Sequence, residues 1–206
     1  VAEHGLRIGI EPGARLLANN ETAHLVYREL VNTRRTLTDQ STSMQTVVTA
    51  VVSLDQQLAE HAVSPRRLRE FDAEVIARIE NLGETGKTGK TVAKDREMLA
   101  VAQRRQQLSY IVDDVRARKT EQDVIDFADL LRFGHELAHR ADVQQIIRER
   151  FSLVLLDEYQ DTSIVQTELL SSLFGRGHSV TAVGDPLQAI YGWRGASIGA
   201  MEEFPG

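Results

Sequence analysis

The 206-residue sequence contains no cysteine. This absence excludes a disulfide framework and thiolate metal sites, and it fits a protein of the cytoplasm. Long apolar segments are lacking as well: no run of about 18 or more apolar residues predicts a membrane span, and no basic-then-apolar leader predicts secretion. We expect a cytoplasmic protein with no membrane partner. Because the chain starts at Val1 and stops after Gly206 without a natural-looking terminus, we interpret it as a piece of a longer protein.

Positive charge is also scarce, because the sequence carries a formal net charge of -6 at pH 7. A protein that holds nucleic acid by bulk charge normally presents a basic surface, so the whole chain does not fit that class. The charge is unevenly spread: residues 64–119 carry 13 Lys and Arg against 9 Asp and Glu, whereas residues 120–206 carry 6 against 14. The asymmetry indicates either a basic lobe joined to an acidic one or solvated helix faces.

Helical periodicity dominates the first 125 residues. One predicted helix has apolar residues at the three-and-four spacing of a single face, at Met44, Val47, Val48, Val51, Leu54 and Leu58. A second repeats this spacing at Leu68, Phe71, Val75, Ile79 and Leu82. Ser64 and Pro65 supply its N-cap and first-turn proline. A third helix is predicted from about Val92 to Lys119, with four residues facing inward: Leu108, Ile111, Val112 and Val115.

Further along the chain the pattern becomes that of an α/β domain. Asp126 is placed to cap a helix, and continuous apolar runs over Phe151–Leu156 and Val180–Val183 predict two buried strands of a parallel sheet. Between them, Ser163 and Gln166 form an S-x-x-Q capping box at the start of a helix. Strand, helix and strand in this order predict a crossover unit.

Acidic residues follow the first of these strands. The string LLDEYQDT, residues 155–162, places Asp157 and Glu158 at the carboxyl end of the strand, where open parallel sheets bind their ligands. Neighbouring side chains there point in different directions, so Asp157 can meet a magnesium ion while Glu158 orients or deprotonates an attacking water. Alternatively, both acids merely solubilise the strand end; the third acid, Asp161, favours the catalytic interpretation.

A second set of candidate residues follows the second strand, in the string VGDPLQAIYGWRGA, residues 183–196. Gln188 can hydrogen-bond a terminal phosphate oxygen and so report whether a nucleotide is intact. Tyr191, Trp193 and Arg194 lie on a glycine-containing loop, which suits stacking against unpaired bases. Alternatively, Trp193 anchors the core, but its glycine and arginine neighbours favour an exposed role.

A glycine- and lysine-rich segment, GETGKTGKT at residues 83–91, superficially resembles a phosphate-binding loop. Such a loop needs Gly, four residues, then Gly-Lys-Ser/Thr, after a strand and before a helix. In the two available registers the first position is Asn81 or Glu84, and the preceding segment is helical in pattern. We therefore predict a basic interhelical loop in which Lys87 and Lys90 contact a DNA backbone.

The strings LLDEYQDTS and VGDPLQAIYGWRGAS closely resemble motifs II and III of superfamily 1 DNA helicases of the UvrD/Rep/PcrA kind. IDFADLL, residues 125–131, resembles the segment that precedes motif II in that family. Together these strings cover about residues 125–200, and the wording of motif III is similar to that of actinobacterial helicases and helicase-nucleases.

The resemblance implies a helix-dominated α/β fold: a mainly helical 1B-like subdomain over residues 1–124, then the distal part of a RecA-like, parallel-sheet P-loop NTPase domain (1A) over residues 125–206. It makes Asp157 the magnesium-linked acid, Glu158 the residue that activates water and Gln188 the γ-phosphate sensor. Tyr191, Trp193 and Arg194 become single-strand contacts.

The implied parent is an ATP-dependent DNA helicase with ATP and Mg²⁺ as cofactors, associated with the nucleoid. Its expected partners are single-stranded and forked DNA, the remaining motor domains of the same polypeptide, and a nuclease or repair protein. Because the chain has no phosphate-binding loop, we expect the chain alone not to hydrolyse ATP. The alternative is a non-catalytic helical module that binds DNA or protein and keeps only a remnant of a motor.

Overall fold

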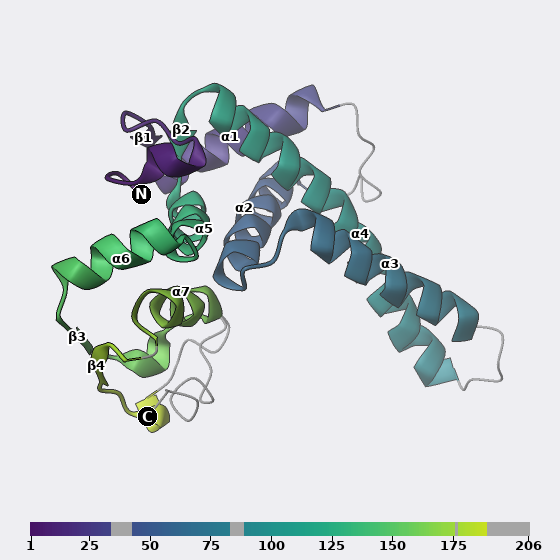
Figure 1. The fold of residues 1–206 in the computed structure, drawn as a ribbon. Coiled ribbons are helices and arrows are strands. Elements are labelled where there is room, and N and C mark those ends of the chain that lie inside the picture. The colour runs from purple at the N-terminus through teal and green to yellow at the C-terminus, as the bar shows by residue number, and fades with distance from the viewer. Residues whose placement is uncertain (34–42, 83–88, 176, 189–206) are drawn as a thin grey trace. The chain divides into compact units, whose positions relative to one another are not determined.

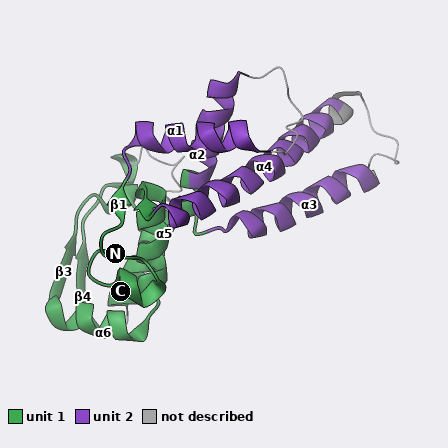
Figure 2. Cartoon of the chain, turned by 90° about the horizontal axis from the view of Figure 1, so that it is seen from above, with its two compact units in different colours: residues 1–16, 56–62, 123–206 green, residues 17–55, 63–122 purple. Residues whose placement is uncertain are grey.

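The computed structural model describes residues 1–33, 43–82, 89–175 and 177–188 (Figure 1). The chain divides into two compact units, shown in different colours in Figure 2. Unit 1 comprises Val1–Leu16, Gln56–Ala62 and Asp123–Gly206, and unit 2 comprises Leu17–Asp55 and Val63–Gln122. Residues 1–16 therefore group with the last part of the chain, whereas a division at residue 124 placed them with the helical part. The identity of the units as subdomains stays a prediction.

The helices α1 (Asn19–Asn32), α2 (Met44–Glu60), α3 (Pro65–Leu82) and α4 (Gly89–Glu121) supply most of unit 2. The three helices predicted from periodicity are confirmed as α2, α3 and α4. Ser64 caps α3 as expected, because its Oγ accepts a hydrogen bond from the Arg67 N–H at 3.1 Å. Within the described residues, no helix is long and apolar enough to cross a membrane.

The core of unit 2 lies where α4 packs along α3 and α1. The inward side of α4 is confirmed, since Leu108, Ile111, Val112 and Val115 are all buried. The predicted apolar face of α3 is wrong at Phe71, which is 52% exposed. The next residue, Asp72, is buried instead and pairs with Arg105 of α4, so a charged pair occupies the position expected for an apolar contact.

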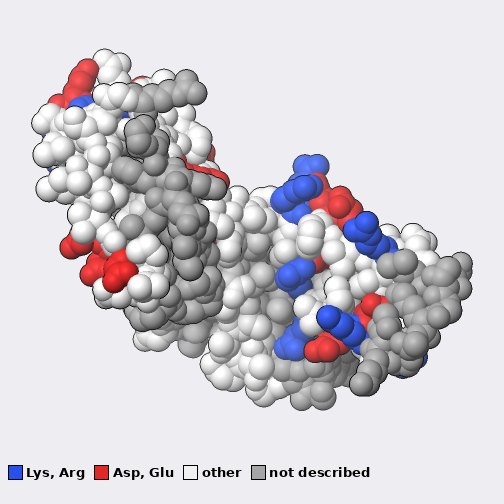
Figure 3. Space-filling view, turned by 90° about the horizontal axis from the view of Figure 1, so that it is seen from below, with Lys and Arg blue, Asp and Glu red and all other residues white. Residues whose placement is uncertain are grey.

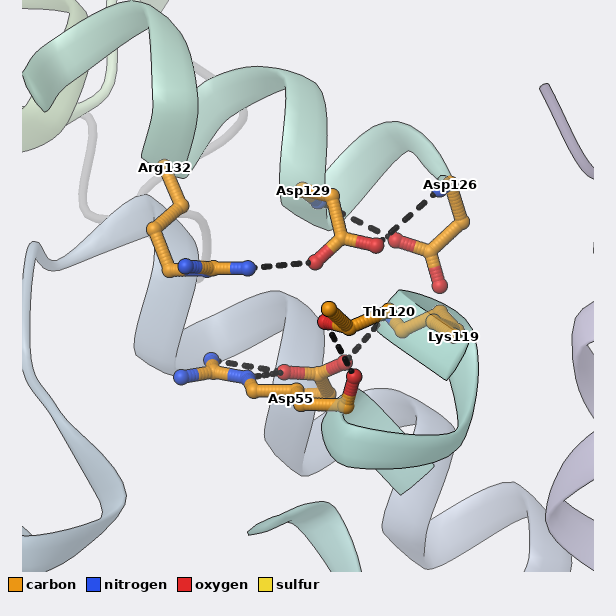
Figure 4. A network of polar contacts seen from close by, with 7 residues as sticks. Asp55, Lys119, Thr120, Asp126, Asp129 and Arg132 are labelled. Carbon is orange, nitrogen blue, oxygen red and sulfur yellow. Dashed lines mark hydrogen bonds and ion pairs between the residues drawn. The ribbon is translucent and has the colours of Figure 1, made fainter. Parts of the chain in front are cut away.

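A second buried ion pair joins α2 to α4 within unit 2. Figure 4 shows Asp55 against the end of α4, where Arg116 Nη2 lies 2.7 Å and Lys119 Nζ 3.3 Å from its carboxylate oxygens. Only 2% of the Lys119 side chain is exposed. Burying a lysine requires such partners, because an ammonium loses its hydration on leaving water.

Unit 1 contains η1 (Gly5–Ile8), the parallel pair β1 (Arg15–Leu16) and β2 (Val124–Ile125), and helices α5 (Phe127–Ala138) and α6 (Ala141–Arg150). The rest comprises β3 (Leu153–Leu156), η2 (Tyr159–Asp161), α7 (Ile164–Phe174), β4 (Ser179–Ala182) and η3 (Pro186–Gln188). Helices α6 and α7 each pack on α5, and α6 also packs on α7.

Both predicted helix caps of unit 1 are confirmed. Asp126 Oδ1 accepts the Asp129 N–H and Asp129 Oδ2 accepts the Asp126 N–H, each at 3.1 Å (Figure 4). Ser163 Oγ accepts the Gln166 N–H, and Gln166 Oε1 accepts the Ser163 N–H at 2.9 Å. These reciprocal bonds satisfy amide groups that lack partners within the helix. They fix where α5 and α7 begin.

Strands β3 and β4 pair in parallel, with Leu153 opposite Ser179 and Leu156 opposite Ala182. The predicted strand, helix and strand order is therefore confirmed. The prediction that both strands are buried is wrong: Leu153 and Leu155 are 56% and 71% exposed. Alternate side chains point to opposite faces, and within the described part of the chain only one face of this pair is partly covered.

Candidate active site

The candidate site lies at the carboxyl edge of the β3–β4 pair. The backbone pairing continues past both strands: the Val183 N–H donates to Leu156 O at 2.8 Å, and the Tyr159 N–H donates to Val183 O at 3.0 Å. The loops that follow β3 and β4 are therefore held side by side. Ligands of open parallel sheets bind at such an edge.

Asp157 and Glu158 follow β3 directly, and both side chains are exposed. Asp157 Oδ1 accepts a hydrogen bond from the Glu158 N–H at 2.9 Å. Glu158 has a left-handed backbone with φ 52° and ψ 39°, which turns the chain sharply from the strand into η2. The turn separates the directions of the two carboxylates, as two different chemical roles require.

Gln160 connects the two loops. Its side chain is buried, and Nε2 donates to Glu158 Oε2 at 2.6 Å, while Oε1 accepts the Asp185 N–H at 3.0 Å. Gly184 makes this approach feasible, because a Cβ added there would lie 2.4 Å from Gln160 Oε1. A hydrogen-bonded path thus runs from the acidic loop after β3 to the loop after β4.

Asp185 holds Gln188 in the second loop. Its Oδ1 accepts the Leu187 N–H at 3.0 Å, and its Oδ2 accepts from Gln188 Nε2 at 2.8 Å. The hydrogen bond from the Gln188 side chain, followed by that from the Leu187 amide, lowers the pKa of the Asp185 carboxyl below its ordinary value. Gln188 and Glu158 therefore belong to one cluster, joined through Asp185 and Gln160.

The oxygen atoms of this edge suit a hard divalent cation. Among the described residues, no group of three or more His, Cys, Asp or Glu could hold a metal alone. Mg²⁺ needs no such group, because it is usually bound by one or two carboxylates with waters and substrate phosphates. Asp157 is an exposed carboxylate, and Asp161 Oδ1 is buried without a hydrogen-bond partner among the described residues. The donor set fits Mg²⁺ at Asp157.

Four of the predicted DNA-binding residues lie outside the described part of the chain: Lys87, Tyr191, Trp193 and Arg194. Lys90 lies in the first turn of α4, where only its backbone is described. Their roles stay predictions.

The described arginines of the predicted basic stretch are extensively paired with acids inside unit 2. Arg66 lies 3.0 Å from Glu70, Arg69 lies 2.8 Å from Asp113, and further pairs involve Arg67, Arg105, Arg116 and Arg118. On the face in Figure 3, blue and red side chains are accordingly interspersed. These pairs weaken the positive field that the residue count suggested.

Two residues of the cluster received no role from the sequence. Gln160 lies inside the motif II string, but its partner on the second loop is 25 residues away. Gly184 precedes a strand-end acid, and its close approach to Gln160 depends on the same tertiary contact. A polar amide in a short turn between acids was the one available signal for Gln160.

Comparison with known proteins yields a family and several relatives. The family model described as "UvrD/REP helicase N-terminal domain" matches residues 2–206. DNA helicase II of Escherichia coli (strain K12) is 43% identical over 82 residues, which is 39% of this chain and 11% of that protein. An ATP-dependent helicase/nuclease of Lactococcus lactis subsp. lactis (strain IL1403) is 37% identical over 87 residues, 42% of this chain and 7% of that protein. The aligned regions thus span only a small part of each relative.

Proposed function

The chain belongs to the UvrD/REP helicase N-terminal domain family, and from this membership we propose that it is part of an ATP-driven DNA helicase motor. The observation that carries the proposal is the cluster at the carboxyl edge of β3 and β4. There, Glu158 and Gln188 are joined through Gln160 and Asp185. A non-catalytic remnant would give no reason for acids and a glutamine to be held in register on adjacent strands.

In the proposed reaction, Glu158 orients and deprotonates the water that attacks the γ-phosphate of ATP. Its exposed carboxylate is steadied by Gln160 Nε2, which leaves the second oxygen for the water. Asp157 would hold Mg²⁺, which neutralises phosphate charge when bound. Gln188 bonds the γ-phosphate, for which its amide would exchange the Asp185 contact for a phosphate oxygen.

We assign unit 2 to a 1B-like helical subdomain and the segment over residues 125–206 to the distal part of a RecA-like domain 1A. Tyr191, Trp193 and Arg194 follow Gln188 in the sequence, so bases stacked there would be coupled to the nucleotide site. The DNA substrates are single-stranded and forked DNA, which would place the protein at the nucleoid in the cytoplasm. The name of the Lactococcus relative includes a nuclease, so a nuclease partner is a further proposal.

The proposal is tested by changing Glu158→Gln in the complete helicase and measuring ATP turnover with and without single-stranded DNA. Removal of a general base should lower turnover by about 10²–10⁴-fold while nucleotide binding persists. Glu149→Gln is the matched control, because Glu149 is an exposed acid on α6. Unchanged turnover in Glu158→Gln, or loss of nucleotide binding by the folded variant, would contradict the assignment.

The 206-residue chain by itself should not hydrolyse ATP. It contains no Gly-x-x-x-x-Gly-Lys-Ser/Thr sequence, so it lacks the lysine that neutralises the β- and γ-phosphates. A DNA-stimulated turnover of the chain alone that disappears in Glu158→Gln would overturn this expectation.

A further inference from the structure

We propose that Gln160 is a positioning residue that sets the Glu158 carboxylate relative to the loop carrying Gln188, so that movement of this loop is transmitted to the water-activating group. The inference rests on the proposed function. It concerns a residue that contacts neither nucleotide nor water and acts through its two hydrogen bonds.

The chemistry of the Gln160 side chain suits this task. An amide presents one acceptor and one donor group, and each is used toward a different loop. A backbone N–H can only donate, so the atom facing Asp185 N at 3.0 Å must be the oxygen. The nitrogen is then left to face Glu158 Oε2 at 2.6 Å, where a carboxylate needs a donor. The orientation of the amide is therefore fixed by its partners.

Burial makes this orientation consequential. Gln160 is 2% exposed, so water does not readily replace either hydrogen bond. A buried amide group that loses its partner bears its full desolvation penalty. The bond to Glu158 is also charge-assisted, which makes it the stronger class of hydrogen bond. A shift of the Asp185 amide therefore moves Gln160, and Gln160 moves Glu158.

Gly184 adds an independent geometric constraint. An added Cβ would lie 2.4 Å from Gln160 Oε1 and 3.2 Å from the backbone nitrogens of Tyr159 and Gln160. The loop after β4 is therefore seated directly on the Gln160 turn. The absence of a side chain at Gly184 is what permits the contact.

The two hydrogen bonds can be separated by substitution in the complete helicase. Gln160→Glu keeps an acceptor for the Asp185 N–H but removes the donor to Glu158, whereas Gln160→Met removes both. Gln145→Met is the matched control, because Gln145 Nε2 donates to Glu149 Oε1 at 2.9 Å on the exposed surface of α6. Hydrogen–deuterium exchange of the peptide spanning residues 183–188 reports the first bond, and steady-state ATP hydrolysis reports the second.

We expect Gln160→Glu to leave exchange of this peptide unchanged while kcat per folded molecule falls by about tenfold or more and the KM for ATP changes little. Gln160→Met should lower kcat similarly and also raise the exchange rate of the peptide about tenfold or more. Gln145→Met should do neither. A purely structural role for Gln160 would not lower kcat in Gln160→Glu while exchange and melting temperature stay at wild-type values.

Full kcat in Gln160→Glu, with a wild-type enzyme that hydrolyses ATP, would overturn the inference, as would unchanged exchange in Gln160→Met. A wild-type helicase without ATP turnover would instead overturn the proposed function, and the exchange measurement would still decide whether the Gln160–Asp185 bond exists. If Gln160→Met does not fold, Gly184→Ala disturbs the same contact from the opposite loop. It is expected to raise exchange and lower kcat, and wild-type behaviour would overturn the inference.

Discussion

Arg105 donates from Nε to both carboxylate oxygens of Asp72, at 3.1 and 3.0 Å, and the Asp72 side chain is completely buried. The hydrogen bonds from Arg105 join α4 to α3, and the interaction with Asp72 raises the pKa of the Arg105 guanidinium. The guanidinium itself reaches solvent, so the two partners differ in what each loses when the other is removed.

Arg105→Met should therefore destabilise the protein by about 3–5 kcal/mol, because it leaves Asp72 buried without its arginine. The double variant with Asp72→Leu should recover most of this loss, since apolar residues can replace a buried pair. Arg66→Met is the control: its partner is on the exposed surface of α3, and the expected loss is about 0.3–0.5 kcal/mol. Urea unfolding measures all three, and a loss below about 1 kcal/mol in Arg105→Met would contradict the expectation.

Gln188→Ala should raise the pKa of Asp185 toward its ordinary value. The Gln188 side chain is the main cause of the lowered pKa, and a lowered carboxyl pKa means that the contact stabilises the loop at neutral pH and is lost as the pH falls through the lowered value. Carbon-13 NMR titration of the Asp185 carboxyl in the two proteins measures the shift. Gln166→Ala, which alters only the cap of α7, should leave this pKa unchanged. Equal values with and without Gln188 would show that the contact does not form in solution.

Trp193→Ala should reduce affinity for single-stranded DNA by about 1–3 kcal/mol, or uncouple DNA binding from ATP turnover, with little loss of stability. The reason is the sequence around it, since Tyr191, two glycines and Arg194 suit a base-stacking loop better than a core. A core tryptophan would instead cost about 3–5 kcal/mol of folding free energy. Thermal melting beside a DNA titration separates the two cases. A large drop in melting temperature with unchanged DNA response per folded molecule would assign Trp193 to the core.

Charge reversal at Lys87, Lys90 and Lys94 should weaken binding of the complete helicase to a forked duplex and reduce the salt dependence of that binding. Each phosphate contact that is lost should lower the slope of log K against log salt by about 1. Arg150→Glu is a control outside this segment, because Arg150 lies 3.0 Å from Glu3 in unit 1. Unchanged affinity at low salt would favour the interpretation of these lysines as a solvated face.

Local signals in the sequence predicted the helices well. The Ser163–Gln166 box and the Asp126 cap act within one turn of the chain, so their hydrogen bonds could be predicted from spacing alone. Burial was harder to predict, because it depends on what covers a face. Leu155 lies in an apolar run and is still 71% exposed, and Phe71 is exposed where the helical period placed it inward.

The same distinction applies to the site. The sequence located Asp157, Glu158 and Gln188 at two strand ends, because strand and motif are both local. It did not reveal Gln160, whose partners become neighbours only when β3 and β4 pair. The pairing of Arg15 with Val124 was also missed, since two-residue strands leave no periodic pattern.

The left-handed backbone of Glu158 places stability and activity in opposition at a single position. A residue with a side chain is disfavoured in that conformation by about 1–2 kcal/mol, whereas glycine adopts it freely. Selection for heat resistance alone would therefore favour replacing Glu158 with glycine. Such a lineage would become hardier while it discarded the group proposed to activate water.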